Sequence, residues 1–274
     1  MTRSKLFQGF ALISGAALCL FALGIFCLWP GATKLWIWPK TPPLGFVFVA
    51  AMLAGAAAPL VWIGLSGQLA AIRAAMLTGM VTNTGIALHL YVNHALPGRE
   101  RYLPFAALFA FGSILTSAVF AWSKRLPATG DRSIPPIIRW AFLLFSAILM
   151  PVGAAMVLGI PHIFPIPLTT DMAAVYGWFL LGSFTYYFYG FWKPSQLNST
   201  GHLLSFLIYD LLMLPPYSKY WAVVAPEFRT SLFVFLTVLI TSAIFCGYFL
   251  LLDTRTRLFK GGAGVLPSMA RYRE

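Results

Sequence analysis

One acidic residue of this chain stands in an unusual setting. Seven Asp and Glu residues occur among 274, and only Asp210 falls well inside a long apolar run. At an offset of 127 residues, its segment aligns with an earlier apolar run that also carries polar side chains. A polar group inside such a run costs free energy, which a function or a partner must offset. The aligned pairs are Asp210 with Asn83, Tyr209 with Thr82, and Ser205 with Thr78.

These six side chains predict a ligand-binding site. Both runs are interrupted, one by Gly79 and Gly85 and the other by Pro215-Pro216. In transporters built from repeats, matched and interrupted helices often frame a site near the middle of the bilayer. We therefore predict that Asp210 and Asn83 face each other there and bind a proton or a polar ligand. The alternative is an interhelical hydrogen bond that sets the register of two helices and is worth about 0.6–2 kcal/mol.

The four histidines do not form a recognisable metal or haem site. His89 and His202 fall at opposite ends of their apolar runs, and no His-x-x-x-His pair is present. Metal-binding histidines need further ligands at short spacing and partners for their second nitrogens. We expect no metal site, and we expect His89 to be a hydrogen-bonded residue at the membrane interface. No motif names a cofactor.

Enzyme motifs are also absent or misplaced. The segments "GLSG" (64–67) and "HLYVN" (89–93) are similar to the serine and oxyanion motifs of rhomboid proteases, but they stand in the reverse order. They also fall at opposite ends of one apolar run, about 30 Å apart across a bilayer. A nucleophile and its oxyanion donors must lie within a few ångströms. The chain also lacks a phosphate-binding loop, an Asp-x-x-x-Asp cluster and a desaturase histidine set, so we do not expect an enzyme.

The composition places the chain in a membrane. It is 59% hydrophobic and 9% charged, with a mean hydropathy of +0.81. A soluble domain carries roughly a quarter of charged residues, because water must solvate its surface. Eight apolar runs of near membrane-spanning length predict an all-α, polytopic helix bundle. These runs are 6–29, 44–66, 70–92, 104–123, 137–160, 172–192, 201–217 and 230–252. The run at 201–217 is the shortest and ends at Pro215-Pro216, so the sequence leaves open whether it crosses the whole membrane.

A repeated stretch suggests that the bundle is duplicated. "ILTSAVFA" (114–121) returns as "LITSAIFC" (239–246), and Gly55 matches Gly182 at the offset of 127. Such matches in consistent order predict a tandem repeat of two four-helix units. An even number of helices per unit gives both units the same orientation in the membrane. The predicted parts are repeats at 1–123 and 137–252, a polar cytoplasmic linker at 124–136 and a basic cytoplasmic tail at 253–274.

The basic residues predict the orientation and the partners. Of 19 Lys and Arg residues, 13 fall on the side of the amino terminus and 6 on the other side. Because basic loops stay in the cytoplasm, we expect both termini there, in a plasma (inner) membrane. The net charge of +12 then reflects topology and a tail that contacts anionic lipid headgroups. We expect the lipid bilayer, a second copy or another membrane subunit as partners, and no nucleic acid.

Three functions fit this sequence. The first is a small-molecule or ion transporter with a polar site at the repeat interface, at the middle of the membrane. The second is a non-catalytic subunit or scaffold of a larger complex, which the scarcity of buried charge favours. The third is a protein that binds or modifies a lipophilic molecule, for which the aromatic run "FTYYFYGFW" (184–192) is the main indication.

Overall fold

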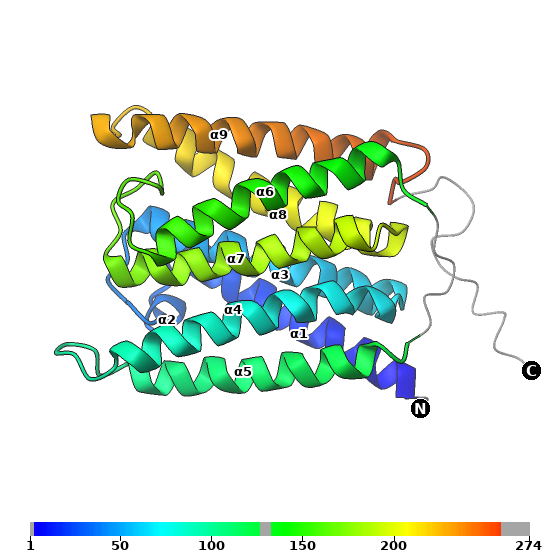
Figure 1. Ribbon diagram of the computed structural model, residues 1–274, viewed down its shortest axis with the longest axis horizontal. Coiled ribbons are helices and arrows are strands. Elements are labelled where there is room, and N and C mark those ends of the chain that lie inside the picture. Colours follow the sequence, from blue (N-terminus) through cyan, green and yellow to red (C-terminus); the bar gives the residue numbers. More distant parts are fainter. Residues whose placement is uncertain (1–2, 127–132, 259–274) are drawn as a thin grey trace, which may run out of the picture.

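The protein is a bundle of long helices. The computed structural model describes residues 3–126 and 133–258, and within them every long element is a helix (Figure 1). Short elements join or extend these helices: α2 (Pro30–Thr33), the 3₁₀ turn η1 (Leu69–Ala71) and the π-helical turn η2 (Tyr248–Leu252). The long helices are α1 (Arg3–Phe26), α3 (Pro43–Ser66), α4 (Ile72–Asn93), α5 (Tyr102–Ser123), α6 (Pro136–Val157), α7 (Thr170–Trp192), α8 (Gln196–Tyr220) and α9 (Pro226–Gly247).

Six of these helices are long and apolar enough to cross a membrane: α1, α3, α5, α6, α8 and α9, the last continued by η2. The chain is therefore an integral membrane protein. Helices α4 and α7 have 22 and 23 residues, which corresponds to about 33 Å of helix. Neither contains an 18-residue stretch as apolar as those of the other six, because residues such as Arg73 and Asn83 in α4 and the tyrosines of α7 lower the mean hydropathy.

Helix boundaries follow simple local signals. Pro43, Pro136 and Pro226 begin α3, α6 and α9, where the missing N–H of proline costs nothing. The Thr169 hydroxyl caps α7 by accepting from the backbone N–H of Met172 at 3.3 Å. Gly67 ends α3 with φ of 73°, a left-handed conformation that glycine adopts without strain.

Helix α8, which corresponds to the seventh apolar run, is longer than the sequence predicted. The apolar run at 201–217 predicted a short segment that ends at Pro215-Pro216, whereas α8 runs from Gln196 to Tyr220 and contains both prolines. Tyr217 is fully buried, and its hydroxyl donates to the backbone oxygen of Leu44 at 3.1 Å. This contact with α3 holds the turn after the prolines in helical geometry, and membrane helices tolerate proline where neighbours compensate in this way.

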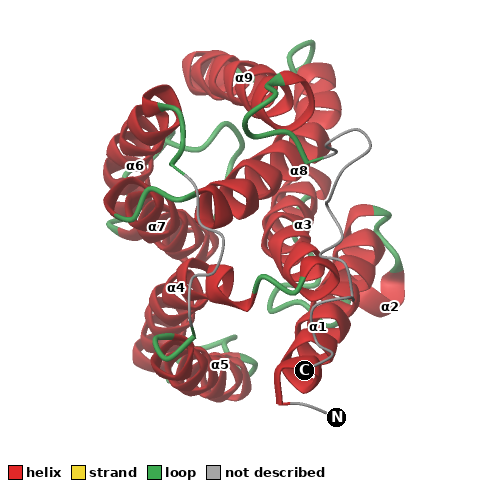
Figure 2. Ribbon diagram, turned by 90° about the vertical axis from the view of Figure 1, so that its right-hand side faces the viewer, coloured by secondary structure: helices red, strands yellow, loops and turns green. Residues whose placement is uncertain are grey.

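The long helices form two rows that lie against each other (Figure 2). Packing contacts place them in the order α1, α3, α8, α9 in one row and α5, α4, α7, α6 in the other. Neighbours in the chain form the outer pairs α1–α3, α4–α5, α6–α7 and α8–α9. The contacts α3–α8 and α4–α7 at the centre of each row join segments that are far apart in sequence.

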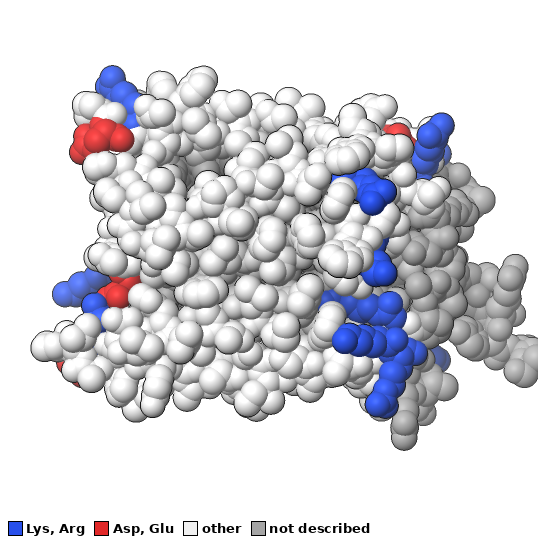
Figure 3. Space-filling view, viewed as in Figure 1, with Lys and Arg blue, Asp and Glu red and all other residues white. Residues whose placement is uncertain are grey.

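Charged side chains occupy the two ends of the bundle and leave an uncharged body between them (Figure 3). We call the end where α1 begins the basic end, because Lys124, Arg125, Arg139 and Lys193 lie there at helix termini. Of the predicted linker and tail, 127–132 and 259–274 lie outside the described residues. At 253–258 the chain turns, and the Asp253 carboxylate accepts from the backbone N–H of Arg255 at 2.7 Å.

Candidate functional site

The predicted site residues lie where the central helices cross most closely. On α4, Thr78 and Thr82 are one turn apart and face Gly182 of α7. A Cβ added at Gly182 would overlap the Thr82 hydroxyl and lie 3.2 Å from the backbone oxygen of Thr78. Glycine is therefore needed for α4 and α7 to approach this closely.

The same crossing occurs between α3 and α8. A Cβ at Gly55 of α3 would lie 3.2 Å from the backbone oxygen of Ser205 and 3.6 Å from the Cβ of Tyr209. Four of the six predicted site residues thus flank two glycines that match each other in sequence. Open space lies between the central helices beside these two crossings.

A cavity of about 760 Å³ fills this space. Its walls come from α1, α3, α4, α5, α7 and α8, with Leu149 of α6 and with Leu35 and Trp36 of the loop before α3. Most of the lining is apolar and includes Met52, Phe109, Phe179 and Phe206. The structure brings five of the six predicted residues to this cavity: Thr78, Thr82, Asn83, Ser205 and Tyr209.

The sixth predicted residue, Asp210, is not among the cavity-lining residues. Its side chain is fully buried between α8 and α9, where the Ser242 hydroxyl lies 2.6 Å from Oδ2. Oδ1 has no hydrogen-bond partner among the described residues. Asn83 lies on α4 against Gly112 of α5, and Thr116 of α5 packs on Gly79, one turn before Asn83. The structure therefore does not bring Asp210 and Asn83 together, and each side chain faces the neighbouring helix of its own hairpin.

The repeated stretch supplies the surroundings of both side chains. Ser242, from "LITSAIFC", contacts Asp210, and Thr116, from "ILTSAVFA", lines the cavity close to Asn83. The two environments differ in one respect. Asp210 is enclosed by protein, whereas Asn83 is partly exposed and borders the cavity.

Several hydroxyl groups of the cavity wall are already engaged. Thr78 donates to Ala74 O at 3.1 Å, Thr116 to Gly112 O at 2.8 Å and Ser183 to Phe179 O at 3.0 Å. Such bonds to the preceding turn satisfy the hydroxyl hydrogen within the same helix. Within the described residues, neither the Asn83 carboxamide nor the Tyr209 hydroxyl has a hydrogen-bond partner. The Trp36 indole nitrogen of the wall is likewise buried without a partner within the described residues. Asn83 differs from it because a carboxamide supplies both a donor and an acceptor.

The cavity reaches the surface between α1 and α5. Leu18 and Phe21 of α1 and Phe105 and Leu108 of α5 line it, and Leu108 is 60% exposed. Ala56 of the central helix α3 also lines the cavity and is itself exposed. Because Leu18, Ala56 and Leu108 lie away from the ends of their helices, the opening faces the side of the bundle.

Contacts at both ends confine this side opening. At the basic end, the rings of Phe7 in α1 and Trp122 in α5 stack at 3.8 Å. At the opposite end, Arg101 donates to the backbone oxygens of Lys34 at 3.1 Å and Trp36 at 3.2 Å. The first contact joins the helices directly, and the second holds the 34–38 loop against the start of α5.

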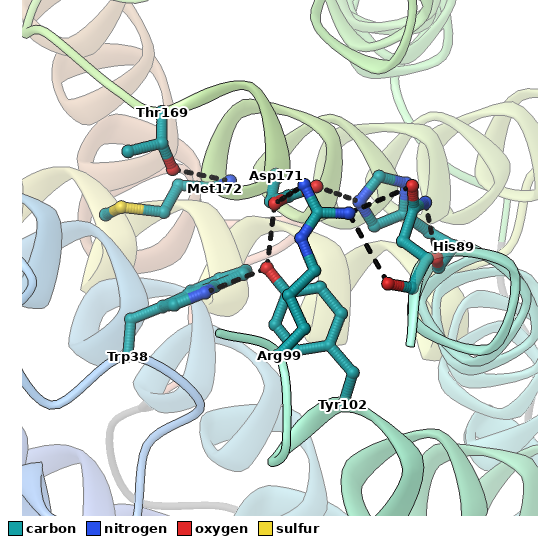
Figure 4. Close-up of polar contacts among 8 residues, drawn as sticks. Trp38, His89, Arg99, Tyr102, Thr169, Asp171 and Met172 are labelled. Atoms are coloured by element: carbon teal, nitrogen blue, oxygen red, sulfur yellow. Dashed lines mark hydrogen bonds and ion pairs between the residues drawn. The ribbon is translucent and has the colours of Figure 1, made fainter. Parts of the chain in front are cut away.

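A polar cluster around Asp171 closes the opposite end of the bundle (Figure 4). The Asp171 carboxylate lies 2.7 Å from Arg99 Nη2, accepts from the Tyr102 hydroxyl at 2.8 Å and lies 3.2 Å from His89 Nε2. The Trp38 indole donates to Tyr102 Oη at 3.2 Å. This cluster ties α4, α5, α7 and the loop before α3 together, and it contains the ion pair between Arg99 and Asp171.

The cluster confirms that His89 is hydrogen-bonded, but sequence reasoning missed its partner. The run at 172–192 left Asp171 in a loop, whereas α7 begins at Thr170 and places the acid in its first turn. The Thr169-x-Asp171 pattern before an apolar run, typical of a helix start, was the available signal.

The aromatic run at 184–192 divides between two environments. Tyr186 and Tyr187 line the cavity, whereas Trp192 is 64% exposed at the basic end. Trp36, from the loop before α3, is buried and lines the cavity next to Phe179, at a ring distance of 6.5 Å. The run therefore contributes both to the cavity wall and to the membrane interface.

Comparison of the chain with protein-family models, with curated proteins and with solved structures finds no match. The chemistry of the site therefore rests on the geometry described above.

Proposed function

We propose that this membrane protein is a carrier that binds an uncharged lipophilic molecule in the cavity between its central helices. The observation that carries this proposal is the cavity itself: about 760 Å³, lined by apolar side chains and a few uncharged polar ones. Ligand pockets for small molecules typically measure about 300–1,000 Å³ and are largely apolar. The volume and the lining both fit a small lipophilic ligand.

The lining favours a neutral ligand. Within the described residues, no Asp, Glu, Lys, Arg or His side chain lines the cavity. A charged group in such surroundings costs several kcal/mol unless a counter-charge or several hydrogen bonds compensate it. An inorganic ion or a zwitterion would find neither here, so a molecule without formal charge is the best match.

The position of the opening supports entry from the bilayer. The cavity emerges between α1 and α5, at the exposed side chain of Leu108. Both helices are apolar enough to cross the membrane, so lipid chains surround this side of the bundle. A lipophilic molecule dissolved in the bilayer could therefore reach the cavity without passing through water.

We further propose that all eight long helices cross the membrane as two tandem repeats. The packing supports this: if α1, α3, α4 and α5 correspond to α6, α7, α8 and α9, then each contact has a counterpart. The pair α1–α3 matches α6–α7, α4–α5 matches α8–α9, and α3–α8 matches α7–α4. Helix α1 begins and η2 ends at the same end of the bundle, as an even number of crossings requires (Figure 1).

The glycine crossings support the same correspondence at single residues. Gly55 packs on Ser205 and Tyr209, and Gly182 packs on Thr78 and Thr82. At the offset of 127, Gly55 corresponds to Gly182, Ser205 to Thr78 and Tyr209 to Thr82. Each repeat would then place its second helix on the third helix of the other, so that the cavity lies at their interface, as in many repeat-built transporters.

The orientation is part of the proposal. Basic residues at the basic end, among them Lys124, Arg125 and Lys193, favour a cytoplasmic location for that end and for both termini. The opposite end, with Glu100, Asp171 and Glu227, would then face the outside.

Photolabelling with an aliphatic probe tests the binding function. Protein in phosphatidylcholine nanodiscs is irradiated with a diazirine-bearing hexadecane, and labelled residues are identified by peptide mass spectrometry. We expect labels at Met52 and Met76, which line the cavity. Ala56→Phe should reduce them several-fold by filling the cavity, whereas Ala118→Phe, on the exposed surface of α5, should not. Equal labelling in both variants would contradict the proposal.

A further inference from the structure

We infer that Asn83 is the polar anchor of the cavity, and that the ligand carries a hydroxyl group for it. This inference rests on the proposed function and names the chemical class of the ligand: a lipophilic alcohol. It starts from the hydrogen-bond inventory of the cavity wall, in which the Asn83 carboxamide is unpartnered among the described residues.

Asn83 lies in the middle of α4 and borders the cavity. Its neighbours across the helix interface leave it little to bind: a Cβ added at Gly112 would lie 3.0 Å from Nδ2, and the Thr116 hydroxyl already donates to Gly112 O. A carboxamide without a partner in an apolar environment is unfavourable by a few kcal/mol. The cavity is the direction in which a partner can approach.

The chemistry of the carboxamide selects the partner. Nδ2 donates and Oδ1 accepts, so a group that does both satisfies it best. A hydroxyl has one hydrogen to donate and two lone pairs to accept, whereas an ester or ether oxygen only accepts. The Tyr209 hydroxyl, also on the wall and unpartnered within the described chain, adds a second site of the same neutral character. The remaining wall accommodates the hydrocarbon part.

Asn83 and Asp210 illustrate why the first residue carries this role. Both occupy corresponding positions at the offset of 127, but the Ser242 hydroxyl lies at hydrogen-bonding distance from Asp210 inside the protein. The corresponding motif in α5 leaves Asn83 unsatisfied and next to open space. A polar group that the fold leaves unpartnered beside a cavity points to a ligand outside the chain.

Two matched probes test this inference. One is a diazirine-bearing sixteen-carbon alcohol, and the other has the same chain with a terminal methyl group. In phosphatidylcholine nanodiscs, we expect the alcohol to label cavity residues roughly tenfold more than the alkane, the effect of one or two hydrogen bonds in an apolar site. Asn83→Leu should bring the ratio close to one. Thr84→Val, on the exposed face of the same helix, should leave the ratio unchanged.

The outcomes separate the two proposals. If both probes label the cavity of the native protein equally, the hydroxyl anchor is wrong and the lipophilic cavity stands. A ratio that stays near ten in Asn83→Leu would assign the preference to another residue and overturn the role of Asn83. If neither probe labels Met52 or Met76, the proposed function fails together with this inference. The native-protein ratio requires no variant to fold, and Asn83→Ser provides a smaller polar replacement for comparison.

Discussion

At the scale of single residues, burial alone does not mark a ligand site in this membrane protein. Asp210 and Asn83 occupy corresponding places in sequence, yet one is enclosed beside Ser242 and the other borders the cavity. Sequence reasoning gave greater weight to Asp210, because a carboxylate is the more costly group to bury. The structure shows that the two residues differ in their surroundings. Asp210 is enclosed beside Ser242 of α9, whereas Asn83 borders the cavity.

The enclosed position of Asp210 predicts a mild phenotype for Asp210→Asn. An amide oxygen can still accept from Ser242, and a neutral side chain is cheaper to bury than a carboxylate. We expect the melting temperature in detergent to change little, by the equivalent of under about 1 kcal/mol, and alcohol-probe labelling to persist. Loss of labelling at an unchanged melting temperature would instead assign Asp210 to the ligand or to a coupling proton.

The Asp171 cluster predicts a larger effect on stability. Asp171→Asn removes the charge that Arg99 and His89 face and weakens the hydrogen bond from Tyr102. Because the cluster is mostly shielded from water, we expect a loss of about 2 kcal/mol and a clearly lower melting temperature. Glu227→Gln is the matched control, since Glu227 is an exposed acid in the first turn of α9. Equal melting temperatures for the two variants would show that the cluster is not stabilising.

At the scale of helices, the apolar runs of the sequence predicted the long helices well, and the main difference is the length of α8. The eight runs correspond to the eight long helices, and helix existence followed from apolar length alone. The extension of α8 past Pro215-Pro216 could not be predicted, because it depends on Tyr217 reaching Leu44 in a distant segment.

The same limit applies to the candidate site. Five of the six residues at the matched polar positions line the cavity wall, because they lie on α4 and α8 where these helices border the cavity. The cavity itself was not predicted, since its shape depends on how side chains such as Trp36 and Phe179 pack. Tertiary packing, rather than local sequence, decides which polar group borders open space.

The helix crossings predict sensitivity to a single methyl group. In Gly182→Ala the new Cβ would overlap the Thr82 hydroxyl, so α4 and α7 must move apart. We expect a loss of about 1–3 kcal/mol and a lower melting temperature. Gly9→Ala in α1 is the control, because a Cβ there meets no atom within 4 Å. Unchanged stability in Gly182→Ala would mean that the crossing tolerates a wider spacing than the structure shows.

At the scale of the whole molecule, the two proposed repeats have similar helix packing but differ in the size of the side chains between their helices. Phe206 packs against Phe145 at 4.4 Å and against Tyr187 at 4.0 Å, forming an aromatic cluster on the α6 side. At the offset of 127, the residues equivalent to Phe206 and Tyr187 are Gly79 and Leu60. Smaller side chains on the α1 side leave open the space that aromatic rings fill on the other.

The proposed orientation is testable with introduced cysteines. Glu227→Cys and Arg125→Cys place a thiol at exposed positions of opposite ends, in a background without the exposed Cys19 and Cys27. A membrane-impermeant maleimide applied to intact cells should label Glu227→Cys, and should label Arg125→Cys only after lysis. The reverse pattern would place both termini outside.

The central claim is that the cavity holds a small lipophilic molecule, and native mass spectrometry tests it most directly. The protein is extracted in the mildest workable detergent, and the mass of the intact particle is compared with that of the 30.2 kDa chain. The account predicts a small added mass in the native protein and its loss in Ala56→Phe, but not in Ala118→Phe. A bare chain, or a particle whose extra mass is another polypeptide and no small molecule, would contradict the account and favour a subunit of a larger membrane complex.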